Sequence, residues 1–228
     1  MTAHLMLSFP KAIIFDFDGV IGDSELLSAR AFSEALTGAD CPTSEEEAIA
    51  RYTGLSRPDT LAAIASHWGE RCPADLDRLL SDTADRHFAA GVPAIEGAVA
   101  FITGTVAHLP KAIGSSSTLA YLDTHVDALG LRPSFGRHVY SGREHVTRGK
   151  PHPDIYLHAA AQLKVPPSEV LIIEDSPVGS RAAVAAGARV IGLAAAGHCT
   201  PDMTDALRAV GVETVAESYD ALTRHLGL

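Results

Sequence analysis

Six short apolar segments alternate with segments of helix length, and this alternation constrains the fold more than any other feature of the sequence. The apolar segments are strand-like and lie at 11–16, 111–114, 138–140, 170–173, 189–193 and 213–215. The helix-length segments are amphipathic and rich in Ala, and they lie at 95–108, 118–130, 153–163, 177–187 and 202–210. Strands that alternate with helices form parallel sheets covered on both faces. The sequence therefore predicts an α/β fold with a parallel sheet and helices on both faces.

The stretch from Gly22 to Gly91 breaks this alternation, because it contains helical patterns and no convincing strand pattern. The helical patterns lie at 25–36, 44–52, 58–68 and 73–89. We expect a helical module, residues 22–91, to be inserted after the first strand, with hinges at Gly22 and at 91–93. Residues 1–21 and 92–228 would then form the core domain. A single continuous fold with extra helices is the alternative.

The composition is that of a globular protein, since 46% of the residues are hydrophobic, 20% are charged, and the formal net charge is -10. Such an acidic chain lacks the basic face that sequence-independent nucleic-acid binding requires. The three cysteines are far apart and include no C-x-x-C pair, which disfavours a disulfide framework and a zinc ribbon. The sequence shows no signal-peptide pattern and no membrane-span pattern. We therefore expect a cytoplasmic protein that binds neither nucleic acid nor membranes.

Polar residues follow several of the predicted strands, at the edge where ligands bind in parallel α/β sheets. They comprise two acidic pairs, a serine run and a lysine: Asp16 and Asp18, Glu174 and Asp175, Ser115 to Ser117, and Lys150. Each group alone has an ordinary interpretation, as solvated loop carboxylates, a helix N-cap or a surface lysine. Together they would place oxygen ligands, hydroxyl groups and one cation at a single edge, a combination that suits Mg²⁺ and a phosphate group.

The same residues carry a family resemblance. The segment Asp16-Phe17-Asp18-Gly19-Val20, followed by Asp23-Ser24-Glu25, resembles the first motif of the haloacid dehalogenase (HAD) superfamily. Ser115, Lys150 and the pair Glu174-Asp175 match its second, third and fourth motifs in order. The resemblance covers nearly the whole chain and is closest to subfamily IA, the group of β-phosphoglucomutase and small sugar-phosphate phosphatases. It implies a Rossmann-like core with an inserted α-helical cap domain.

By this resemblance, Asp16 is the nucleophile that becomes an aspartyl phosphate, and Asp18 is the general acid and base. The implied Mg²⁺ ligands are the Asp16 carboxylate, the Asp18 backbone carbonyl and Asp175, with Glu174 as a helper. The implied phosphate-binding residues are Ser115, Ser116 and Lys150. The acidic pair of the first motif favours phosphoryl transfer over dehalogenation, because the family's dehalogenases lack the second aspartate and the metal.

Two positions of the inserted module bear on the substrate. Arg57, at the end of segment 54–57, resembles the cap arginine that holds a second anionic group of the substrate; alternatively it is a solvated residue at a helix start. Ser28 stands where the mutases of this group carry a histidine that helps to keep water from the phospho-aspartate. We therefore expect a monomer that hydrolyses a small-molecule phosphate ester, such as a sugar or sugar-acid phosphate. The alternatives are a β-phosphoglucomutase-type mutase and a phospho-receiver, whose smaller fold lacks the helical insertion.

Overall fold

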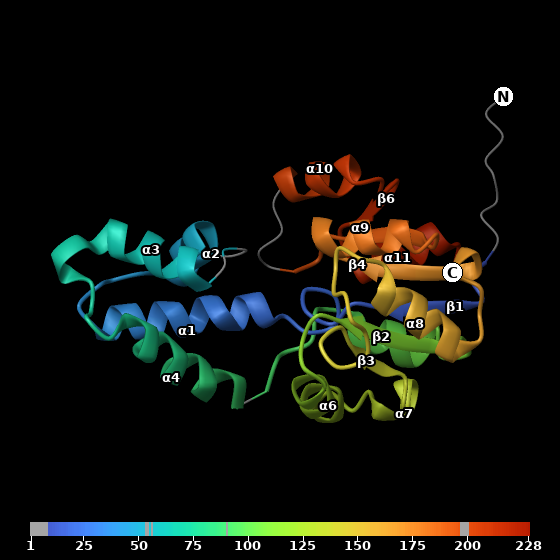
Figure 1. Cartoon of the computed structure of the whole chain (residues 1–228), viewed down its shortest axis with the longest axis horizontal. Coiled ribbons are helices and arrows are strands. Elements are labelled where there is room, and N and C mark those ends of the chain that lie inside the picture. Colours follow the sequence, from blue (N-terminus) through green and yellow to red (C-terminus); the bar gives the residue numbers. More distant parts are fainter. Residues whose placement is uncertain (1–8, 53–54, 56, 90, 197–200) are drawn as a thin grey trace.

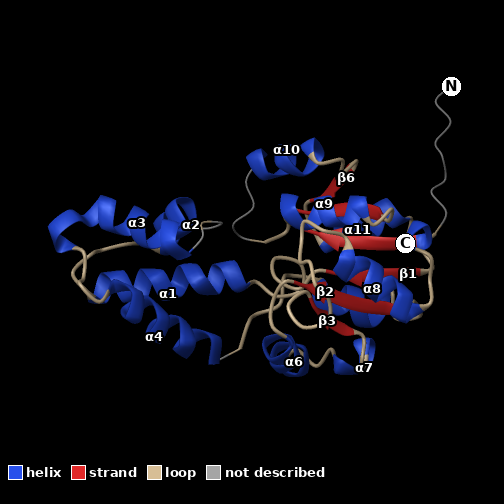
Figure 2. Cartoon of the chain, viewed as in Figure 1, coloured by secondary structure: helices blue, strands red, loops and turns tan. Residues whose placement is uncertain are grey.

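The computed structural model describes residues 9–52, 55, 57–89, 91–196 and 201–228, and it contains one sheet of six parallel strands (Figures 1 and 2). The strands are β1 (Ala12–Phe15), β2 (Lys111–Ser115), β3 (Val139–Ser141), β4 (Val170–Glu174), β5 (Arg189–Leu193) and β6 (Thr214–Ala216). Their order across the sheet is β3-β2-β1-β4-β5-β6, and all neighbours pair in parallel. The six predicted strands are thus confirmed, each within one residue at either end.

Side chains of the strands point alternately to the two faces of the sheet, as strand geometry requires. In β1, Ile13 and Phe15 pack into the core on one face, and Ala12 and Ile14 pack into the core on the other. The first face is covered by α5 (Ala98–Ala100) with a π-helical turn (Phe101–Thr105), α6 (Leu119–Ala128), α7 (Arg132–Phe135) and α11 (Tyr219–Leu226). The second face is covered by α8 (Asp154–Leu163) and α9 (Pro177–Ala185). The prediction of helices on both faces is confirmed.

The remaining elements are short. One 3₁₀ turn, Gly69–Arg71, follows the helix at Arg57–Trp68, and another, Pro167–Glu169, precedes β4. Helix α10 (Pro201–Ala209) packs on α9 and β6. The predicted helix at 95–108 is instead the short α5 followed by the π-helical turn Phe101–Thr105. That turn contains two threonines and Gly104, which are poor helix formers, so regular α-helix is not sustained there. Helices α7 and α11 were not predicted from the sequence.

Four helices form a module beside the sheet (Figure 1). They are α1 (Ser24–Gly38), α2 (Glu45–Tyr52), α3 (Arg57–Trp68) and α4 (Leu76–Ala89), close to the predicted bounds. α1 packs against both α2 and α4. The module has a hydrophobic core of its own, formed by residues such as Leu36, Ile64 and Leu80. The α-helical cap expected beside the α/β core is therefore present.

The two linkers between the module and the core pair with each other. Gly22 forms an antiparallel bridge with Ala94, and Ile95 N donates to Ile21 O at 2.9 Å. A Cβ atom on Gly22 would lie only 2.9 Å from side-chain carbons of Phe17 and Val92, so only glycine fits this close approach. The predicted hinge segments thus lie side by side, and their role as hinges stays a prediction.

Within the described ranges, no helix is both long and apolar enough to pass through a membrane. Cys41 and Cys72 are free thiols. Cys199 lies outside the described residues.

Candidate active site

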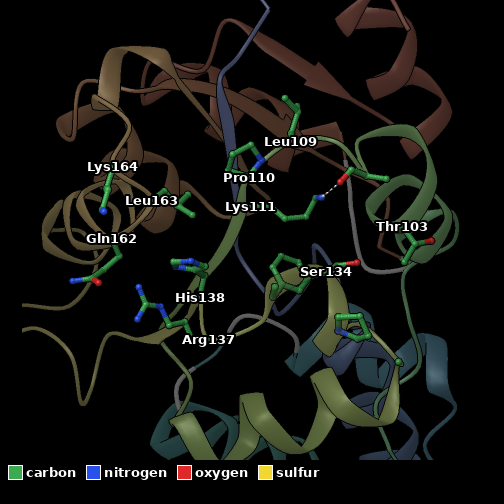
Figure 3. A pocket seen from close by; sticks show the side chains of 14 residues that line it. Thr103, Leu109, Pro110, Lys111, Ser134, Arg137, His138, Gln162, Leu163 and Lys164 are labelled. Carbon is green, nitrogen blue, oxygen red and sulfur yellow. Dashed lines mark hydrogen bonds between the residues drawn. The ribbon is translucent and has the colours of Figure 1, made fainter.

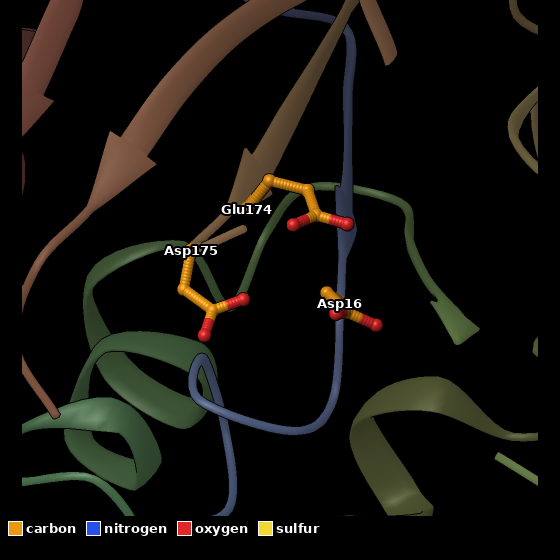
Figure 4. Close-up of side chains that lie close together, drawn as sticks. All are labelled: Asp16, Glu174 and Asp175. Atoms are coloured by element: carbon orange, nitrogen blue, oxygen red, sulfur yellow. The ribbon is translucent and has the colours of Figure 1, made fainter. Parts of the chain in front are cut away.

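Three acidic side chains meet at the carboxyl edge of the sheet, at the ends of β1 and β4. Asp16 directly follows β1, and its N–H donates to Ile173 O at 3.0 Å, which fixes it beside β4. Glu174 is the last residue of β4, and Asp175 follows it. Figure 4 shows the three carboxylates facing one another. Each offers a carboxylate oxygen, and these oxygens all lie within 4.8 Å of one another. They meet because β1 and β4 are neighbouring parallel strands, whose carboxyl ends lie at the same edge of the sheet.

Lys150 lies within this acidic cluster and contacts two of its members. Its Nζ atom is 2.9 Å from Asp16 Oδ1 and 2.7 Å from Glu174 Oε1. Glu174 is fully buried and is held further by Tyr156, whose hydroxyl donates to Oε1 at 2.7 Å. The N–H and the hydroxyl of Ser176 each donate to Glu174 Oε2 at 3.0 Å. Both oxygens of Glu174 therefore already accept protein hydrogen bonds, and the residue anchors Lys150 beside Asp16.

The crowding of carboxylates shifts their proton affinities. Burial raises the pKa of Asp16 to about 7, the Lys150 charge opposes this, and the charge of Glu174 adds to it. Burial also raises the pKa of Asp175 well above its ordinary value. For Glu174, burial acts in the same direction, but the charge and hydrogen bond of Lys150 leave its pKa below the ordinary value. Among the described residues, the Lys150 ammonium contacts two of these three carboxylates, and a further cation would stabilise the ionised forms.

The donor set and the free space fit a small divalent cation. All three acidic residues offer oxygen, the ligand that Mg²⁺ prefers. Asp16 Oδ1 is buried and faces the Lys150 ammonium at 2.9 Å. Gly19, at a φ of +75°, lies against Asp175, and a Cβ atom there would lie 2.6 Å from Asp175 Cγ. Glycine at position 19 therefore leaves the space that the Asp175 carboxylate occupies.

The carboxylate of Asp18 is held by two hydroxyl groups from the segment after β2. Ser117 Oγ donates to Asp18 Oδ2 at 2.6 Å, and Tyr121 Oη donates to Asp18 Oδ1 at 3.0 Å. The Tyr121 ring packs edge-on against Phe17, with 5.9 Å between the ring centroids. Neither hydroxyl was predicted from the sequence to contact Asp18. Ser117 belongs to the recognised serine run, but no local pattern distinguishes Tyr121 from an ordinary residue of helix α6.

A cavity of about 250 Å³ opens above these groups. Ser115 is almost fully buried, and its hydroxyl accepts from Ser117 N at 3.1 Å, which shapes the loop after β2. Ser116 is tied to the next loop, because its carbonyl accepts from Arg143 Nε at 3.0 Å. The cavity is lined by Asp16, Asp18, Glu25, Ser115, Ser116, Lys150, Asp175, Ser176, Val178 and Gly179. Six of the eight predicted site residues thus share one cavity, with Glu174 packed directly behind them.

Arg57 is not among the described residues that line this cavity. Its guanidinium pairs with Asp77 on α4 at 2.8 Å and donates to Ser81 Oγ at 2.8 Å. The preceding residues Gly54 and Ser56 of the predicted substrate loop lie outside the described residues. The structure therefore does not bring Arg57 to the acidic cluster, and its guanidinium has partners within the helical module.

A second cavity, of about 330 Å³, lies inside the helical module. Glu25 lines both this cavity and the acidic one, so the two adjoin. Ser28, the position that a histidine occupies in the resembling mutases, also lines the second cavity. Burial and the charges of Asp18 and Asp23 raise the pKa of Glu25. The part of a ligand that extends from the acidic cluster toward the module would pass Glu25.

The fold and this arrangement match a known class of proteins. A family model described as haloacid dehalogenase-like hydrolase matches residues 13–193, which include every residue of the acidic cavity. The chain therefore belongs to the haloacid dehalogenase-like hydrolase family, and the resemblance drawn from the four motifs is confirmed.

Three relatives illustrate the similarity. Hexitol phosphatase A of Escherichia coli (strain K12) is 28% identical over 228 residues, which cover 93% of each chain. The 6-phosphogluconate phosphatase of the same organism is 24% identical, over 84% of this chain and 86% of the relative. A HAD family hydrolase from Deinococcus radiodurans R1, solved with bound phosphate and sodium, is 34% identical, with a TM-score of 0.84. That alignment covers 95% of this chain and 96% of the solved one.

Proposed function

We propose that this chain is a Mg²⁺-dependent phosphatase that hydrolyses a small phosphate monoester, such as a sugar or sugar-acid phosphate, through an aspartyl-phosphate intermediate. The observation that carries the proposal is the position of Asp16, whose buried carboxylate lies beside the Lys150 ammonium in a cavity lined by hydroxyl groups. A carboxylate nucleophile, a cation for the phosphoryl charge and hydroxyl donors are the groups that phosphoryl transfer requires. The phosphatase names of the two Escherichia coli relatives support the same reaction class.

In the first step, an oxygen of Asp16 attacks phosphorus, the bond from phosphorus to the ester oxygen breaks, and Asp18 gives its proton to the leaving oxygen. In the second step, Asp18 takes a proton from water, and the water oxygen attacks the phosphorus of the aspartyl phosphate. The bond between phosphorus and Asp16 then breaks, which releases inorganic phosphate and restores the Asp16 carboxylate, while Asp18 is again protonated for the next cycle. Ser117 and Tyr121 hold the Asp18 carboxylate for both proton transfers.

The remaining groups bind the phosphoryl group and balance its negative charge. Ser115, Ser116 and Lys150 hold the phosphoryl oxygens, and Glu174 keeps Lys150 in place. Mg²⁺ would be held by Asp16, Asp175 and the Asp18 backbone carbonyl, with Glu174 nearby, and it supplies positive charge to the phosphoryl group. Ser28 supports hydrolysis over the mutase alternative, because a short hydroxyl side chain does not supply the histidine that those mutases carry.

The proposed activity is tested by phosphate release from a panel of sugar, sugar-acid and small-acid phosphates, with Mg²⁺ and with a chelator. We expect release to concentrate on a few esters and to fall to background when the metal is removed. Interconversion of glucose phosphates without phosphate release would instead establish the mutase. Release that is insensitive to chelation would remove the metal from the proposal.

Replacement of Tyr121 by Phe is expected to slow turnover of alkyl phosphates by about tenfold, because Asp18 loses one of its two hydroxyl donors. An aryl phosphate should be less affected, since its leaving group departs without a proton. The ratio of the two kcat values is the measurement. Tyr140→Phe is the matched control, because the Tyr140 hydroxyl pairs with His138 at 2.8 Å and not with Asp18. An unchanged ratio in Tyr121→Phe would contradict the role of this hydroxyl.

Arg57→Ala tests whether Arg57 binds substrate. If it does, KM should rise by about tenfold for a substrate with two anionic groups and far less for one with a single phosphate. Arg86→Ala is the control, since Arg86 also forms an ion pair within the helical module, with Glu34 at 2.8 Å. Equal effects on both substrates would leave Arg57 with its structural role, the contact with Asp77.

A further inference from the structure

A third cavity, larger than the acidic cavity and the cavity of the helical module, lies at the amino ends of β2 and β3, the edge of the sheet opposite to the acidic cluster (Figure 3). Its volume is about 660 Å³. Lys111 begins β2, His138 precedes β3 and Lys164 follows α8, and all three line it. β2 spans five residues, so about 13 Å of strand separates Lys111 from Ser115 at the active-site edge. A ligand in this cavity would therefore be remote from the catalytic groups.

The cavity is lined by basic groups and, among the described residues, by no acidic one. Lys111, Arg137 and Lys164 supply three cationic side chains, and His138 adds an imidazole. None of the three cations forms an ion pair with a described residue, whereas most arginines elsewhere on the described surface do. The chain as a whole carries a net charge of -10. A concentration of unpaired positive charge on so acidic a chain attracts anions to this place.

Lys111 is the most informative of these groups. It is only 4% exposed, and the hydrogen bond that its ammonium makes is to the Ala107 carbonyl, at 3.2 Å. Burial lowers the pKa of Lys111, and no carboxylate among the described residues offsets this effect. A buried ammonium without a counter-charge has a high desolvation cost, and its electrostatic field is screened less than it would be in water. An anion in the adjoining cavity would supply the missing charge.

We propose that this cavity is a second, non-catalytic binding site for a small phosphate-bearing anion. Arg137 and Lys164 would contact the phosphoryl oxygens, and Lys111 would add its charge from the cavity wall. Ser134 and Gln162, which also line the cavity, offer a hydroxyl and an amide for the polar remainder of such a molecule. The volume is in the range of sites that hold small metabolites. The proposal does not depend on the catalytic reaction.

The test counts phosphate ions bound per chain by equilibrium dialysis against inorganic phosphate, because the active site binds phosphate as well. The wild-type protein should bind one phosphate more per chain than the double variant Arg137→Ala/Lys164→Ala. A second double variant, Arg78→Ala/Arg208→Ala, removes the same charge from exposed residues on α4 and α10 and should keep the wild-type count. Equal counts in all three proteins would overturn the proposal.

Diffraction from crystals soaked in selenate, whose selenium scatters anomalously, locates the bound anion. A selenium peak between Arg137 and Lys164 that is absent from the Arg137→Ala/Lys164→Ala protein is the expected result. Peaks confined to the Asp16 cavity would contradict the second site. Turnover of the best substrate should be within about twofold of wild type in the double variant at low phosphate, since the two cavities lie at opposite edges.

Discussion

Asp16→Asn is expected to lower turnover by about four orders of magnitude or more, because an amide oxygen is too weak a nucleophile to form the phosphoryl intermediate. The fold should persist. Burial raises the pKa of Asp16, which means that the site disfavours the charge of this carboxylate, and the neutral amide has nearly the same shape. Lys150 keeps its contact with Glu174 at 2.7 Å. We therefore expect a melting temperature within about 5 °C of wild type.

The measurements are single-turnover phosphate release, thermal unfolding and detection of the phosphorylated protein. Asp205→Asn is the matched control, because Asp205 is 80% exposed on α10 and remote from the cavity. Wild-type activity in a folded Asp16→Asn protein would remove the proposed mechanism. Loss of activity together with loss of the fold would show that Asp16 is needed for structure, and the nucleophile would then have to be identified by trapping the intermediate in the wild-type protein.

Gly179→Ala is expected to disrupt the active site although residue 179 has no chemical role. Gly179 lies in the first turn of α9, and a Cβ atom there would overlap the carboxylate of Glu174. That carboxylate has no free direction to move, because Lys150, Tyr156 and Ser176 all hold it. Overpacking and broken hydrogen bonds should together cost about 2–4 kcal/mol of the free energy of unfolding. Displacement of Lys150 should lower turnover by at least about a hundredfold.

Gly104→Ala is the matched control for this substitution. Gly104 lies in the π-helical turn after α5, and nothing lies within 4 Å of the Cβ atom that the substitution would add. Alanine there removes conformational freedom from the unfolded chain and should leave stability equal or slightly raised. Denaturant unfolding and kcat on the same substrate compare the two variants. If Gly179→Ala were as stable and active as Gly104→Ala, Glu174 would be less firmly held than its hydrogen bonds indicate.

Most of the fold and of the site could be predicted because both depend on local patterns. A buried parallel strand is a short apolar run, and each of the six runs became a strand. The carboxyl ends of such strands lie together, so residues directly after the runs, such as Asp16 and Asp175, were placed in one site by topology alone. The helices of the inserted module followed from amphipathic spacing in the same way.

The hydrogen-bond partners of Asp18 and Glu174 could not be predicted, because they depend on contacts between segments that are not adjacent in the sequence. Tyr121 is 103 residues from Asp18, and Tyr156 is 18 residues from Glu174. In a helical pattern, a tyrosine that binds a site residue looks the same as one that only packs against the sheet. The partner of its hydroxyl is known only once the fold is known. Arg57 is a case in which the motif was recognised but the contact was not predicted. Its long side chain reaches Asp77, 20 residues later, and no sequence motif indicates this pair.

The pairing of the two linkers has a mechanical consequence. Gly22 bridges Ala94 in the opposite linker and also Asp18 in the loop after β1, so one residue ties three segments together. The helical module is thus joined to the core by two linkers that pair with each other as a narrow two-stranded ribbon, and not by two independent linkers. A ribbon bends more easily than it shears, since shear breaks its hydrogen bonds. If the module swings, it would therefore flex both linkers at once and displace the loop that carries Asp18, the proposed acid–base group.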